Sequence, residues 1–132
     1  MKKGILDKAL EHFDAILQQV PDHVETLMNV GLIHLEKNLF EQAIGSFSRI
    51  LESEPKHRNG LEHLELIYER QENYADQIHV LLKLEDIEPL NLDYLLKIAN
   101  CYFKLLNYGK TEEYALKILD IENNHQEALN LA

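Results

Sequence analysis

Residues 24–57 read VETLMNVGLIHLEKNLFEQAIGSFSRILESEPKH, and this stretch decides the fold. Its apolar residues recur at intervals of three and four, first around Val30 and His34 and again around Phe47. That spacing places them on one face of each of two amphipathic helices. Pro55 follows the second helix, and proline cannot continue a helix. The stretch therefore predicts two helices with a short turn between them and a break after the second.

The same unit recurs along the chain. Pro21, Pro55 and Pro89 stand 34 residues apart (55 − 21 and 89 − 55), and the next step reaches Asn123. Stepping by this interval aligns four sets of positions: Ala9, Ala43, Gln77 and Thr111; Phe13, Phe47, Leu81 and Ala115; Ile16, Ile50, Leu84 and Ile118; and Leu27, Leu61, Leu95 and Leu129. The first three sets lie in the second helix of the unit and the last in the first helix. A fixed period of this length indicates a repeat architecture.

The repeat predicts an all-helical chain. Helices are expected at about 5–20, 25–37, 40–53, 59–71, 74–87, 93–105, 108–121 and from 126 onward. Gly4, Asn38, Asn73 and Asn107 precede the second helix of each unit, and Gly and Asn tolerate the left-handed backbone best. We therefore expect the turn to use a left-handed residue at these four positions.

A two-helix unit with this period resembles the tetratricopeptide repeat (TPR) family, and the resemblance covers essentially the whole chain. The residues that match the family pattern most completely are Val30, Gly31, His34, Asn38, Phe40, Ala43, Phe47, Ile50 and Pro55. The resemblance implies an all-α fold, an α-solenoid of stacked antiparallel helix pairs that forms a right-handed superhelix. It divides a single array, 1–132, into 1–23 as the second helix of a partial repeat, full repeats at 24–57, 58–91 and 92–125, and the start of a further helix at 126–132.

In the TPR family the first helix of each unit lines a concave groove that usually holds the ligand. The groove positions implied here are Met28, Asn29, Leu32, Leu35, Glu62, His63, Leu66, Glu69, Leu96, Lys97, Asn100 and Phe103, with Glu25, Asp93 and Lys104 beside them. The apolar members offer an adaptable strip for an extended peptide or an amphipathic helix. Each of these side chains could instead pack only against neighbouring helices. The acidic members favour a basic partner.

One TPR subgroup grips the carboxylate at the end of chaperone tails with a set of lysines and asparagines. Met28 and Leu32 stand where that set would carry its first Lys and Asn, and only Asn29 and Lys97 match it. A carboxylate needs two or more converging donors. We therefore expect such a tail to bind weakly or not at all.

Composition excludes several other functions. With 23 acidic and 13 basic residues, the formal net charge of −10 disfavours nucleic acid and anionic membranes. The chain has one cysteine and no apolar run of membrane-spanning length, so a cytoplasmic location without membrane insertion is expected. His23, His57 and His125 recur with the repeat or its multiple, and they would lie too far apart to share a metal ion. Neither a cofactor site nor an activated nucleophile is evident, and we expect no enzymatic activity.

The sequence thus favours a protein–protein interaction scaffold that binds a peptide or helix of a partner protein in its groove. Leu6, Leu10 and Phe13 of the first helix lack a preceding helix to cover them, which is expected either of a segment of a longer array or of two copies that cover each other. The alternative function is therefore a self-assembling architectural module. In that case the exposed end helices would drive homo-oligomer formation. A third option is a non-catalytic part of a larger enzyme.

Overall fold

The computed structural model describes the backbone of residues 2–132 and the side chains from residue 4 onward, and every regular element in this range is a helix. The helices are α1 (Lys2–Gln19), α2 (Val24–Glu36), α3 (Phe40–Ser53), α4 (Arg58–Arg70), α5 (Tyr74–Ile87), α6 (Leu92–Lys104), α7 (Tyr108–Ile121) and α8 (Gln126–Leu131). The all-α prediction is confirmed. Helices α2, α4 and α6 each begin one residue earlier than the sequence predicts.

The earlier starts have a local cause, since a side chain caps the first turn of each first helix. The acceptor is Nδ1 of His23, His57 and His125, or Oδ1 of Asn91, and the donor is the backbone N–H three residues later, at 3.2, 3.0, 3.2 and 3.1 Å respectively. Such a cap satisfies one of the backbone N–H groups that have no partner within the helix. The recurring histidines therefore have a structural role.

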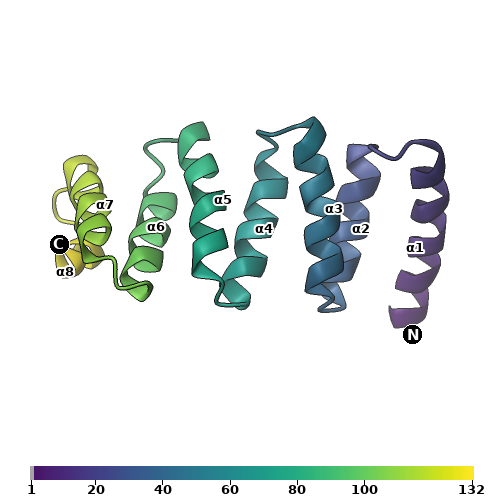
Figure 1. Cartoon of the computed structure of the whole chain (residues 1–132), viewed down its shortest axis with the longest axis horizontal. Helices are drawn as coiled ribbons and strands as arrows, with labels where there is room; N and C mark the ends of the chain where they lie inside the picture. Colours follow the sequence, from purple (N-terminus) through teal and green to yellow (C-terminus); the bar gives the residue numbers. More distant parts are fainter. Residues whose placement is uncertain (1) are drawn as a thin grey trace. The chain divides into compact units, whose positions relative to one another are not determined.

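The chain divides into two compact units, one ending at Ile67 and the other comprising Tyr68–Ala132. In the first unit, α1 packs against α2 and α2 against α3. In the second unit, α5 packs against α6, α6 against α7, and α7 against α8. Figure 1 shows that successive helices within each unit run in opposite directions and are joined by short turns. Each unit is thus a row of antiparallel helices.

The aligned apolar positions form the core of the first unit. Leu27, Phe47, Ile50 and Leu61 have no exposed surface. A Cβ atom on Gly31 would lie 2.7 Å from Cε1 and Cζ of Phe47, so the absence of a side chain lets α2 and α3 approach closely. The interior is filled by the residues that repeat every unit.

The second unit combines an apolar core with a polar cluster that joins α5 to α7. Its core contains Leu81, Leu84, Leu95, Ile98 and Ile118. Tyr114 donates its hydroxyl proton to Glu85 at 2.9 Å, and Lys117 lies 3.3 Å from the same carboxylate. Burial, together with the Glu85 carboxylate, raises the pKa of Tyr114 well above its usual value. The Tyr114 hydroxyl therefore remains protonated and available as a donor.

The left-handed turn residues differ from the prediction at three of four positions. Asn38 has a φ of 59°, as expected, but the other left-handed residues are Glu72, at 54°, and Leu106, at 63°. Asn73 and Asn107 instead cap α5 and α7, each accepting a hydrogen bond from the backbone N–H three residues later. Gly4 lies inside α1. An asparagine suits both roles, and the sequence did not distinguish the two adjacent positions.

Leu106→Asn is expected to raise the free energy of unfolding by about 1 kcal/mol, because a left-handed backbone is costly for leucine and mild for asparagine. Leu106 is 70% exposed, so little packing is lost. Urea denaturation followed by circular dichroism measures the change. Asn38→Leu, the converse change at the matching position, should destabilise by a similar amount, and equal stability of all three chains would contradict the strain.

His34 makes stability depend on pH. It is half-buried, and its Nδ1 atom has no hydrogen-bond partner among the described residues. Burial lowers the pKa of His34 below 6.5, and Lys37 adds to this effect while Asp14 opposes it. As the pH falls, the unfolded chain therefore binds a proton before the folded chain does. The stabilisation is complete above about pH 6.5 and is lost as the pH falls from there through the folded-state pKa.

We therefore expect His34→Tyr to flatten the pH dependence of the unfolding free energy below about pH 6.5. Tyrosine is the residue at the matching positions, 68 and 102, so the substitution fits the repeat. Denaturation midpoints of both chains across this range give the comparison. Parallel curves would show that His34 contributes nothing to the acid sensitivity.

Candidate partner-binding site

Seven of the twelve predicted groove residues lie in the first unit. Met28, Asn29, Leu32 and Leu35 lie on α2, and Glu62, His63 and Leu66 lie on α4. Leu32 is 38% exposed, whereas the other six are half-buried. Helix α2 therefore presents one exposed apolar side chain, that of Leu32, beside three half-buried side chains.

Two of these residues also have structural contacts. The ring of His63 stacks on Phe47 with centroids 5.2 Å apart and the planes inclined by 18°. Its Nδ1 atom lies 2.7 Å from the carbonyl oxygen of Asn59, so the Nδ1–H tautomer donates a hydrogen bond there. Glu62 lies 3.7 Å from Arg58 in an ion pair along α4. His63 therefore helps to cover the core residue Phe47.

The other five predicted residues lie in the second unit. Glu69 is in the last turn of α4, and Leu96, Lys97, Asn100 and Phe103 lie on α6. Phe103 is 46% exposed, and its ring meets Tyr108 edge-on with centroids 5.7 Å apart. An exposed aromatic ring held by a neighbour is a typical anchor for a partner protein.

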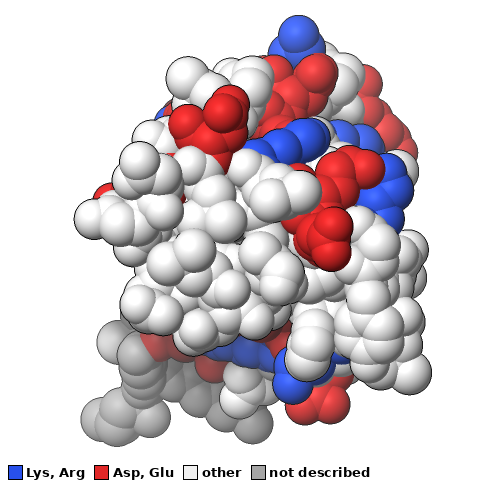
Figure 2. Space-filling view, turned by 90° about the vertical axis from the view of Figure 1, so that its left-hand side faces the viewer, with Lys and Arg blue, Asp and Glu red and all other residues white. Residues whose placement is uncertain are grey.

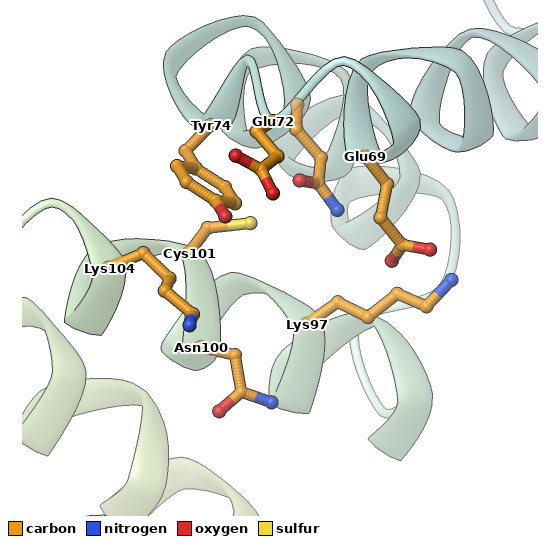
Figure 3. A pocket seen from close by; sticks show the side chains of 8 residues that line it. Glu69, Glu72, Tyr74, Lys97, Asn100, Cys101 and Lys104 are labelled. Carbon is orange, nitrogen blue, oxygen red and sulfur yellow. The ribbon is translucent and has the colours of Figure 1, made fainter.

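A cavity of about 270 Å³ brings three of the predicted residues together. It lies between α6 on one side and the end of α4 and the start of α5 on the other (Figure 3). The lining residues are Glu69, Glu72, Tyr74, Gln77, Lys97, Asn100, Cys101 and Lys104. The predicted residues Glu69, Lys97 and Asn100 thus converge, and the remaining nine lie outside this cavity. Its volume is at the lower limit for ligand pockets and suits a few side chains.

Five lining residues were not among the twelve predicted groove positions, and one of them, Lys104, was expected beside that set. Glu72 is in the turn, Tyr74 and Gln77 are in the first turn of α5, and Cys101 is a buried residue of α6. The prediction included only first helices, so it missed the turn and the second helix. The aromatic column Phe40, Tyr74 and Tyr108 was the available signal for this edge.

Opposite charges face one another across the cavity. Figure 3 shows Glu72 and Tyr74 reaching into the space from one side and Lys104 from the other, while Glu69 and Lys97 extend toward each other at one end. Among the described residues, neither the Glu72 carboxylate nor the Lys104 ammonium group has an ion-pair or hydrogen-bond partner. Both groups are solvated in the free protein and can pair with a ligand without breaking an internal contact.

Two other kinds of site are absent from the part of the chain that the structure describes. From residue 2 onward no helix combines the length and apolarity needed to cross a bilayer. Within the same range, no three His, Cys, Asp or Glu side chains gather in a way that could hold a metal ion.

Comparison with known proteins identifies the fold. The sequence matches no protein-family model and no curated protein. The structure is similar to that of a tetratricopeptide repeat protein from Parabacteroides merdae ATCC 43184, with a TM-score of 0.77, 22% identity, and coverage of 98% of this chain and 52% of that chain. This chain has the tetratricopeptide-repeat fold. The all-α solenoid predicted from the repeat is thereby confirmed.

Two further structures share the TPR fold. One is the crystal structure of MamA, with a TM-score of 0.73, 20% identity, and coverage of 98% of this chain and 76% of that chain. The other is a chain in the structure of Naa15/Naa10 bound to HypK-THB, with a TM-score of 0.76, 17% identity, and coverage of 88% of this chain and 17% of that chain. At these identities the similarity establishes the TPR fold and not a shared activity.

Proposed function

We propose that this chain is a non-catalytic interaction module whose TPR first helices bind a peptide or an amphipathic helix of a partner protein. The observation that carries the proposal is the cavity in the second unit, where residues predicted from the repeat converge around unpaired charged groups. The structure of Naa15/Naa10 bound to HypK-THB, which contains a similar fold, also supports a role in protein assembly.

Exposed apolar side chains on two of the first helices support the same function. Leu32 on α2 and Phe103 on α6 are 38% and 46% exposed. Removing apolar surface from water would contribute to binding at roughly 25 cal/mol per Å². A helical or extended segment with apolar residues on one face could bury side chains of this kind.

The test replaces two exposed groove residues, in the double variant Leu32→Arg with Phe103→Ala. Tagged wild-type and variant chains capture partners from the native cell, and mass spectrometry identifies the proteins lost from the variant. A specific partner should be retained by the wild type and lost by the variant, because a buried unpaired arginine and a missing aromatic anchor both weaken an interface.

The matched control is Leu82→Arg with Leu116→Ala. These side chains are 37% and 52% exposed and lie on the second helices α5 and α7. The control should retain the partner. Equal loss from both double variants, or no loss from either, would contradict binding through the first helices.

Self-assembly is the second candidate function, and one column of the repeat favours it. Leu27, Leu61 and Leu95 are at most 1% exposed, whereas Leu129 at the matching position is 47% exposed. Figure 2 faces α7 and α8 of the second unit, and uncharged residues fill the middle of this face. Leu105, Leu106 and Tyr108, at the turn from α6 into α7, are 46%, 70% and 58% exposed.

Helix α1 has a similar excess of partly exposed apolar surface. Phe13 and Ile16 are only half-buried, whereas their matching residues Phe47 and Ile50 have no exposed surface. Two copies that cover such surfaces would recover the burial found within the units.

If self-assembly is the function, Phe13→Arg and Leu129→Arg should each reduce the molar mass measured by multi-angle light scattering. Leu82→Arg on the exposed side of α5 is the control and should leave the mass unchanged. A wild-type chain that stays monomeric over a wide concentration range would exclude this second function.

A further inference from the structure

The two walls of the cavity carry opposite charges, and this limits which ligands fit. Glu69 and Glu72 approach from the end of α4 and its turn, while Lys97 and Lys104 approach from α6. A ligand of a single charge is attracted by one wall and repelled by the other. A ligand with both charges can match each wall, and complementarity of this kind provides specificity.

We propose that the cavity selects a peptide segment carrying one basic and one acidic side chain close together, with the basic group against Glu72 and the acidic group against Lys104. This proposal rests on the proposed function and adds the chemistry of the bound segment. It also differs from the basic partner expected from the acidic groove residues alone, because lysines form half of the charged lining.

The size and chemistry of the cavity agree with this occupant. A volume of about 270 Å³ admits the ends of two side chains but is too small for a whole helix about 10–12 Å wide. Asn100 adds an amide to the α6 wall, and Tyr74 adds a hydroxyl to the opposite wall. These neutral groups can donate or accept hydrogen bonds on either wall. Each charged group of the ligand would therefore meet both an opposite charge and a neutral polar partner.

The experiment uses three short capped peptides and the ¹⁵N-labelled full chain. In the dipolar probe a lysine and a glutamate flank an alanine, the basic probe has two lysines, and the acidic probe has two glutamates. Chemical-shift titration of the Tyr74 and Asn100 amides measures the affinity. The dipolar probe should bind about tenfold more tightly than either single-charge probe, and rising salt should weaken it.

Charge reversal provides the decisive comparison. Glu72→Lys makes both walls basic, so preference should shift to the acidic probe, and Lys104→Glu should shift it to the basic probe. The double variant Glu72→Lys with Lys104→Glu should recover preference for a dipolar peptide. Both residues are exposed, so the fold should survive, and circular dichroism checks it.

Equal affinity for all three probes, or an unchanged preference after Glu72→Lys, would overturn the proposal. Failure here is separable from failure of the proposed function. If a cellular partner is lost on Leu32→Arg with Phe103→Ala but the probes show no charge preference, the groove binds a partner and the cavity does not select it by charge.

Discussion

Phe47→Ala is expected to lower the free energy of unfolding by about 3–5 kcal/mol. Phe47 has no exposed surface, contacts α2 at Gly31 and stacks on His63 of α4. Truncation would remove its buried ring and leave a cavity among helices that cannot collapse fully to fill it. Because domains are typically stable by only about 5–15 kcal/mol, this single change should remove a large fraction of the total.

Urea denaturation monitored by circular dichroism measures this loss, with Phe103→Ala as the matched control. Phe103 is an aromatic residue of α6 that is 46% exposed, so its truncation should cost much less. Phe47→Leu, which keeps most of the volume, should lie between the two. Equal losses for Phe47→Ala and Phe103→Ala would show that Phe47 is not an anchor of the core.

Gly31→Ala is expected to destabilise the chain by about 1–3 kcal/mol, although alanine normally favours a helix over glycine. The new Cβ would lie 2.7 Å from two ring atoms of Phe47, well inside van der Waals contact. The ring has no exposed surface and also stacks on His63, so it cannot move away without displacing neighbours. Steric overlap therefore outweighs the gain in helix propensity.

Gly45→Ala on α3 is the matched control, because the same glycine-to-alanine change should stabilise the chain at this position. A Cβ atom added at Gly45 would have no described atom within 4 Å, apart from its chain neighbours and the nearby backbone of α3. Here the ordinary preference should apply, and stability should rise by roughly 0.5–1 kcal/mol. Adding Phe47→Leu to Gly31→Ala should recover part of the loss by relieving the overlap. A gain in thermal stability from Gly31→Ala would refute the close approach.

The helices could be predicted from the sequence because the members of each aligned column that fall within 24–125 are buried. Ala43, Phe47 and Ile50 recur at helical spacing and are fully buried. The spacing in the sequence therefore predicts which side chains form the core. The turn was less predictable. Glu72 and Leu106 adopt left-handed backbones that their side chains do not favour. The backbone hydrogen bonds that close each turn, from Asn73 to Tyr68 and from Asn107 to Tyr102, require this conformation in spite of the local preference.

The site was predictable only in part for a related reason. Glu69, Lys97 and Asn100 could be placed because the groove face of a first helix has a fixed register. Glu72 and Tyr74 reach the same cavity from a turn and from the start of a second helix. Their approach depends on how α5 packs against α6, which no spacing within one helix encodes.

The side-chain caps have a consequence for how the chain acquires its structure. Each of His23, His57, Asn91 and His125 bonds to a backbone group only three residues away. Contacts between near neighbours in sequence need little loop closure, and chains rich in them fold quickly. Helix initiation can therefore occur separately in either unit, before the helices dock.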